Sequence, residues 1–148
     1  MTTHRYLRAY ISGIFVPTLV LPFILSGFIF VRLVLKVPVP MERAIIFPMA
    51  LVPLLWGLWN ILWIVTRART HLPLGLHGML LPFLLLPAGI GGAVLLDILT
   101  PVPGGLLIFH TSQIPYTILG TAFLAVLAGY FLFWHFFVGF VNRVLGIA

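Results

Sequence analysis

Residues 10–31 read YISGIFVPTLVLPFILSGFIFV, a run of 22 residues without a charge between Arg8 and Arg32. As an α-helix, this run would be about 33 Å long, which matches the hydrocarbon thickness of a bilayer. The run is too long for the apolar core of a signal peptide, and it carries no small-residue cleavage pattern. It therefore predicts a membrane-spanning helix that is retained in the protein.

Three further runs have a similar length and hydropathy. They cover residues 44–65, 74–96 and 114–141. Because the connections between the first and second and between the second and third runs are short, we expect neighbouring spans to pack as antiparallel helical hairpins. The sequence thus predicts an all-α polytopic membrane protein, with one transmembrane domain of four helices over residues 1–148. The uncharged connection 99–113 predicts a loop that lies on the membrane surface.

The composition excludes a water-soluble fold. Of the 148 residues, 62% are hydrophobic and only 7% are charged, whereas soluble domains carry about 25% charged residues. The formal net charge of +6 comes from basic residues that stand in ones and twos between apolar runs. This pattern is typical of cations that flank membrane spans and contact lipid headgroups, and it argues against nucleic acid as a partner.

The basic residues also predict an orientation in the membrane. Arg5, Arg8, Arg67, Arg69 and Arg143 fall on the side of the two termini, whereas Arg32, Lys36 and Arg43 fall on the other side. The bias of five to three favours cytoplasmic termini. We therefore expect an integral protein of the bacterial cytoplasmic membrane with both termini in the cytoplasm.

Glycine and proline positions suggest an internal repeat with halves 10–66 and 74–143. An offset of 65 residues places Gly13 on Gly78, Pro17 on Pro82, Pro22 on Pro87, Gly27 on Gly92 and Pro38 on Pro103. These residue types mark backbone requirements, so their coincidence is more informative than matches among leucines. Each half contains two spans, which predicts a parallel repeat of two hairpins. The alternative is similarity between helices without a common geometry.

Proline pairs recur in the first three spans. They are Pro17 and Pro22, Pro48 and Pro53, and Pro82 and Pro87. Each proline removes a backbone donor and crowds the carbonyl four residues earlier, so we expect kinked helices. The kinks would serve either as hinges around a carbonyl-lined cavity or only as a common feature of membrane helices.

Two charged residues occupy equivalent positions in the repeat. Asp97, one of two acids in the chain, falls on Arg32. Charges near a membrane favour partners of opposite sign, so we expect an ion pair between Arg32 and Asp97 that closes the outer ends of the hairpins. The alternative is proton or cation coupling at Asp97.

Aromatic and histidine side chains provide the remaining candidates. Trp56, Trp59, Asn60 and Trp63 recur at helical spacing and predict a packing face or, alternatively, a surface for a flat lipid-like or quinone-like molecule. His77 and His135 are expected at similar depth, where two imidazoles can ligate a haem; an interfacial position without a ligand is the simpler interpretation. No other cofactor and no metal site is predicted.

Small residues at close-approach spacing predict that the third and fourth spans form the tight core. They are Ala88 with Gly92, Gly89 with Ala93, and Ala125 with Gly129. The chain lacks a catalytic constellation of carboxylates or of serine, histidine and acid. We therefore expect a non-catalytic membrane subunit whose partners are lipids and other transmembrane helices, in a homo-oligomer or larger complex. The alternatives are a small-solute or lipid transporter or channel, and a haem-binding electron carrier.

Overall fold

The structure is a computed structural model that describes residues 4–36 and 47–147. Its elements are α1 (Arg5–Leu33), α2 (Phe47–Thr70), α3 (Leu74–Met79), α4 (Pro82–Leu95), β1 (Leu99–Val102), β2 (Gly105–Ile108), β3 (Ser112–Pro115), α5 (Tyr116–Leu132), the π-helix η2 (Phe133–Val138) and α6 (Gly139–Val144). Most of the described chain is therefore helical.

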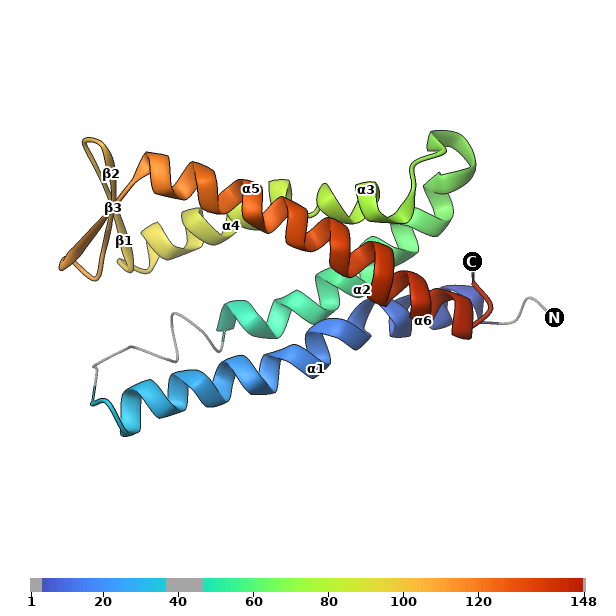
Figure 1. The fold of residues 1–148 in the computed structure, drawn as a ribbon, viewed down its shortest axis with the longest axis horizontal. Helices are drawn as coiled ribbons and strands as arrows, with labels where there is room; N and C mark the ends of the chain where they lie inside the picture. The colour runs from blue at the N-terminus through green and yellow to red at the C-terminus, as the bar shows by residue number, and fades with distance from the viewer. Residues whose placement is uncertain (1–3, 37–46, 148) are drawn as a thin grey trace.

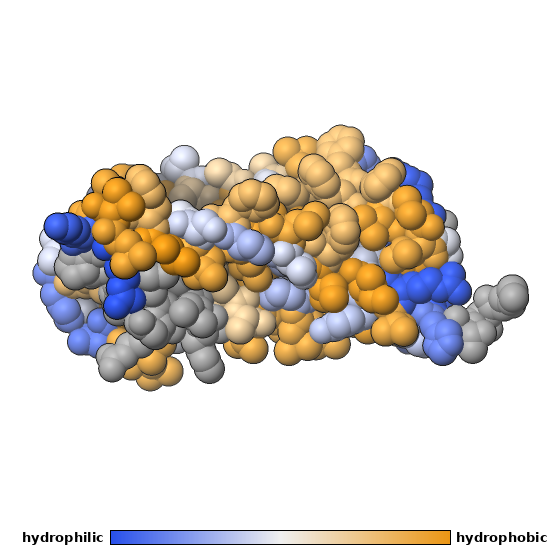
Figure 2. Space-filling view, turned by 90° about the horizontal axis from the view of Figure 1, so that it is seen from below, coloured by the Kyte–Doolittle hydropathy of each residue, from blue (hydrophilic) through white to orange (hydrophobic). Residues whose placement is uncertain are grey.

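The described residues contain four helices that are long and apolar enough to cross a membrane. They are Arg5–Leu33, Met49–Thr70, Leu74–Leu95 and Tyr116–Val144. The prediction of four spans is confirmed, although the first and second helices extend beyond the predicted ends at 31 and 65. The predicted start of the second span, at residues 44–46, lies outside the described residues. Figure 2 shows hydrophilic side chains gathered at the two ends of the molecule and hydrophobic ones between them, as a bilayer requires.

The third span is broken into α3 and α4 rather than continuous. A turn at Leu80 and Leu81 separates the two helices, and Pro82 opens α4. Because Pro82 lacks an N–H, the carbonyl of Gly78 accepts instead from the N–H of Leu81, at 3.1 Å. The indole of Trp59 donates to the carbonyl of His77 at 2.8 Å, so the break in the span leaves this acceptor satisfied.

The connection between the hairpins is a small β-sheet, so the fold is mostly helical rather than all-α, and the loop predicted over residues 99–113 has regular structure instead. Strands β1, β2 and β3 form an antiparallel sheet in that order. Leu99 pairs with Ile108, which in turn pairs with Ser112. Gly104 adopts a φ of 85° in the first turn, a conformation that glycine tolerates well. The pairing gives hydrogen-bond partners to the backbone groups of this connection.

The two hairpins form a V (Figure 1). Helices α1 and α2 make one arm, and α4 and α5 make the other. The arms meet at the end that carries both termini and separate toward the end that carries the sheet. Their closest packing therefore lies in the half of the molecule near the termini.

Glycines show where this packing is tight. A Cβ added at Gly13 would lie 2.5 Å from the carbonyl oxygen of Trp56, and one at Gly57 would lie 2.5 Å from the ring of Tyr10. Gly78 in α3 likewise lies against the ring of Trp134. By contrast, a Cβ at Gly89, Gly92 or Gly129 would meet none of the described residues within 4 Å, apart from its own helical backbone. The small-residue pairs of the third and fourth spans therefore do not form the tight core, which lies at Gly13, Gly57 and Gly78.

Candidate functional site

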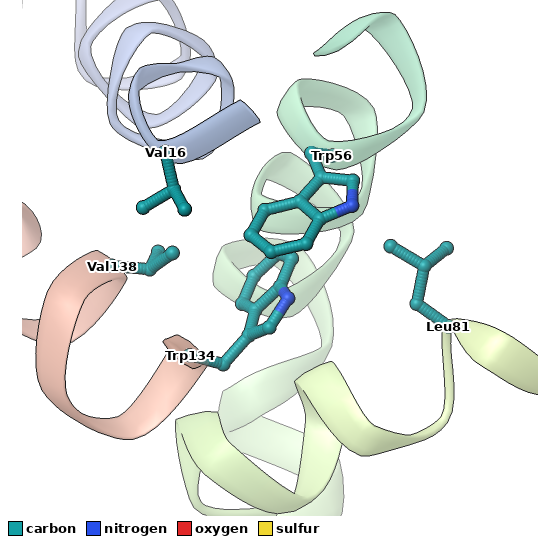
Figure 3. Close-up of a cluster of buried hydrophobic side chains, with 5 residues drawn as sticks. All are labelled: Val16, Trp56, Leu81, Trp134 and Val138. Atoms are coloured by element: carbon teal, nitrogen blue, oxygen red, sulfur yellow. The ribbon is translucent and has the colours of Figure 1, made fainter. Parts of the chain in front are cut away.

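A cluster of buried side chains joins the arms of the V, and Figure 3 shows its members converging from both. They are Val16 of α1, Trp56 of α2, Leu81 from the break in the third span, and Trp134 and Val138 of η2. The indole rings of Trp56 and Trp134 pack with their centroids 5.3 Å apart. Such aromatic contacts stabilise a fold by about 0.5–1.5 kcal/mol in addition to the effect of the apolar area that they bury. We call this cluster the junction.

The π-helix η2 shapes one side of the junction. It buries both Trp134 and Val138, which are four residues apart. The hydroxyl of Ser12, fully buried in α1, donates to the carbonyl of Val138 at 3.4 Å. Short π-helical segments inside α-helices are frequent at functional sites. No spacing pattern in the sequence indicated this segment, because one π turn leaves the surrounding apolar run unchanged.

A pair of buried amides lies beside the junction. The side chains of Asn60 and Asn142 are both fully buried. Asn60 Nδ2 donates to Asn142 Oδ1 at 2.9 Å, Asn142 Nδ2 donates to Asn60 Oδ1 at 3.2 Å, and Asn60 Nδ2 also lies 2.8 Å from the carbonyl oxygen of Ala9. An amide inside an apolar span needs a partner on another helix, and Asn60 stands in such a span. No pattern in the sequence indicated Asn142, which stands at the end of the last span beside Arg143.

Trp56, Trp59, Asn60 and Trp63 recur at helical spacing along α2, and we call them the aromatic stripe. Its members Trp59 and Trp63 hold the start of the third span. The indole of Trp59 donates to the carbonyl of His77, and that of Trp63 donates to the carbonyl of Leu72 at 3.1 Å. The guanidinium of Arg67 lies 5.0 Å from the Trp63 ring centroid. Together with Trp56 and Asn60, these contacts place every member of the stripe against other elements of this chain.

The two histidines lie in different environments. His77 is 5% exposed, its ring packs against Trp59 and Trp134, and its Nδ1 has no hydrogen-bond partner among the described residues. His135 is exposed and stacks on Phe131 with ring centroids 5.7 Å apart. Aromatic rings of this chain thus enclose His77, whereas His135 lies on an exposed surface of η2. Residues 4–36 and 47–147 contain no group of three His, Cys, Asp or Glu side chains suited to a metal ion.

Asp97 contacts a histidine in the sheet rather than Arg32. Its Oδ2 lies 3.2 Å from Nε2 of His110, because the turn between β2 and β3 folds back over the end of α4. Both side chains are exposed, so screening by water makes this contact weak. Arg32 lies in the last turn of α1, in the other arm of the V.

The prolines differ in their surroundings. In α1, Pro17 is buried and Pro22 is exposed; in the third span, Pro82 is buried and Pro87 is exposed. Pro53 lies inside α2, whereas Pro48 is the second residue of that helix, where a missing N–H costs no helical hydrogen bond.

An apolar groove of about 370 Å³ lies between the arms, next to the junction. Its lining comes from α1, α2, α5 and the start of η2: Val16, Pro17, Val20, Leu21, Ile24, Met49, Val52, Trp56, Val126, Gly129, Tyr130 and Phe133. Apart from the Trp56 indole and the Tyr130 hydroxyl, these side chains carry no polar atoms. The groove is therefore suited to hydrocarbon.

The comparisons with known proteins give no relative. No protein-family model, no curated protein and no solved structure matches this chain. Its function is therefore argued from its own geometry. The junction and the amide pair hold the two arms together, and the groove beside them offers an apolar cleft.

Proposed function

We propose that the chain is a non-catalytic integral membrane subunit that assembles with further transmembrane helices, from its own copies or from another protein. The observation that carries this proposal is the state of the glycines in the outer halves of the arms. Apart from its own helical backbone, a Cβ at any of them would meet no atom of the described residues within 4 Å: Gly27, Gly89, Gly91, Gly92 and Gly120.

These glycines have no packing role inside the described chain. Glycine in a helix costs roughly 1 kcal/mol relative to alanine, whereas glycine and alanine at a membrane interface let two helix backbones approach closely. The pair Ala88 with Gly92 presents such a surface on α4. A helix of another subunit would give these positions the contacts that the V leaves open.

The size of the native particle tests this proposal. We expect the protein, extracted in mild detergent and measured by light scattering or native mass spectrometry, to be larger than one chain. Gly92→Ile should weaken the association without unfolding the chain, because a Cβ added there meets no described atom within 4 Å outside its own helical backbone. The matched control is Leu84→Ile, an exposed position in the same helix. A monomer in both detergent and lipid nanodiscs would contradict the proposal.

We also propose that the two arms are copies of one Pro-kinked hairpin, related by an axis along the membrane normal. The support is the similar burial of aligned residues. Gly13 and Gly78 both lie in tight contacts, and Pro17 and Pro82 are both buried. The copies have diverged at the break in the third span, since α1 is continuous past Pro17.

The proposed location is the bacterial cytoplasmic membrane, with both termini in the cytoplasm. The support is the excess of arginines at the end that carries the termini. Cysteine scanning with membrane-impermeant reagents checks the orientation, because the chain has no cysteine of its own. A single cysteine at Thr70 should be protected in intact cells, and one at Thr111 should react.

A transporter of lipid-like molecules is a second candidate, favoured by the groove between the arms. Its apolar lining fits an acyl or isoprenoid chain better than a polar solute. Vesicles that contain the protein should then exchange a fluorescent lipid between leaflets. Gly129→Phe should reduce the exchange by filling the groove, whereas Leu132→Phe, at an exposed position in the same helix, should not. Equal exchange in protein-free vesicles would exclude this activity.

A further inference from the structure

Five arginines gather at the end of the molecule that carries both termini. Arg5 and Arg8 lie at the start of α1, Arg67 and Arg69 in the last turn of α2, and Arg143 in α6. Figure 1 shows these three helix ends at the same end of the V. The single carboxylate side chain among residues 4–36 and 47–147, that of Asp97, follows α4 at the opposite end. The end near the termini is therefore strongly cationic.

Two of the arginines point inward and hold the chain after α6. Nη1 of Arg8 donates to the carbonyl of Leu145, and Nη1 of Arg67 donates to the carbonyl of Ile147, both at 3.2 Å. Cations at this position also interact favourably with the negative end of a helix dipole. Arg8 and Arg67 thus have a structural role.

The other three, Arg5, Arg69 and Arg143, have exposed side chains. They lie at the ends of the apolar spans and therefore at the level of the lipid headgroups. Apolar residues stand beside them; Leu7, for example, is 55% exposed. A guanidinium offers a planar fork of donors that binds phosphate through two hydrogen bonds. The position and the chemistry together identify a phosphate that is attached to a lipid.

We propose that Arg5, Arg69 and Arg143 bind the phosphate groups of anionic phospholipids in the leaflet that borders the termini. Five like charges repel one another, and anionic headgroups relieve that repulsion. Nucleic acid fits less well, because these arginines surround the end of an apolar bundle whose length matches a bilayer. The binding is independent of whether the chain assembles with other subunits.

Lipid titration of the purified full-length protein tests the proposal. We expect phosphatidylglycerol to raise the apparent Tm, with phosphatidylcholine much less effective and high salt reducing the effect. Arg69→Gln/Arg143→Gln should weaken phosphatidylglycerol binding about fivefold for each arginine removed. Adding Arg5→Gln should weaken it further. Arg32→Gln/Lys36→Gln, which removes two charges at the opposite end, is the matched control and should bind as the wild type does.

Lysine variants and competing ligands complete the test. Arg69→Lys/Arg143→Lys keeps both charges but lacks the guanidinium forks, so it should retain part of the phosphatidylglycerol binding. Partial binding by this variant shows that the glutamine variants lose phosphate contacts and not the fold. Equal weakening in the Arg32→Gln/Lys36→Gln control would overturn the proposal, as would equal stabilisation by phosphatidylcholine. An equal Tm increase from inorganic phosphate, or from RNA at the same charge concentration, would assign the site to a different ligand and overturn it as well.

Discussion

Asn60 and Asn142 exchange two hydrogen bonds, at 2.9 and 3.2 Å, although 82 residues separate them in the chain. The pair joins α2, in the first arm, to α6, at the end of the second. Asn60 also donates to the carbonyl of Ala9 in α1, so one amide contacts two other helices. In hydrocarbon, an unpaired amide has no water to bind, which favours the arrangement that satisfies both side chains.

Loss of one amide should destabilise the junction. Asn142→Leu leaves the amide of Asn60 without its reciprocal partner, and we expect a loss of about 1–2 kcal/mol in the free energy of unfolding. Denaturation by SDS in mixed micelles measures the change. The double variant Asn60→Leu/Asn142→Leu should lose less than the sum of the two single changes, because the removed groups bind each other. Strict additivity would contradict the pairing. Thr66→Val, which removes an exposed hydroxyl bonded within its own helix, serves as the control.

The glycine at the start of the third span should tolerate no side chain. Gly78→Ala places a methyl group against the indole of Trp134, and a clash in a packed site costs about 1–3 kcal/mol. Gly89→Ala in the same span meets no atom within 4 Å and should leave the stability unchanged or slightly higher. Thermal unfolding in detergent compares the two variants. Equal losses would show that the close contact at Gly78 is absent.

The inward arginines should hold the chain that follows α6. Arg67→Met removes the donor to the carbonyl of Ile147 while retaining the packing of its stem near Trp63. We expect faster amide hydrogen exchange for the N–H of Ile147, which is bonded to the carbonyl of Asn142. Mass spectrometry of a C-terminal peptide measures the rate. Arg69→Met, at an exposed position two residues away, should have no such effect.

Substitutions of Asp97 should change the free energy of unfolding more through its backbone conformation than through its charge. Its φ is 59°, in the left-handed region that Asn and Gly tolerate and β-branched residues do not. Asp97→Asn removes only an exposed pair with His110 and should cost less than about 1 kcal/mol. Asp97→Val should cost about 1–2 kcal/mol more, because its side chain opposes this backbone conformation. The free energy of unfolding in mixed micelles ranks the two variants. The reverse order would contradict a left-handed backbone conformation at Asp97.

The four spans could be predicted from the sequence because their signal is local. A run such as residues 10–31 has no charge over a length that crosses the bilayer, and no other part of the chain is needed to recognise it. The need of Asn60 for a partner could be predicted for the same reason, since an amide inside an apolar run is unusual. Its partner could not, because Asn142 lies near a charged end, where a polar residue is ordinary.

The sheet and the break in the third span had weaker local signals. Residues 99–108 contain turn residues around a short apolar run, which fits a loop as well as a hairpin. Pro82 indicated a distortion, but Pro17 has a similar context and α1 continues through it. The difference lies in the neighbours: Trp59 of α2 binds the carbonyl of His77, just before the break.

The sequence by itself determined that this chain has four segments long and apolar enough to cross a membrane, and at which end its arginines gather, because hydropathy and charge act on each segment separately. Only the tertiary structure decided that the arms meet near the termini and separate toward the sheet. That arrangement depends on close contacts between distant residues, such as Gly13 against the backbone of Trp56 and Gly78 against Trp134. It also decided that the glycines of α4 and α5 remain open, which is the physical basis for expecting a partner there.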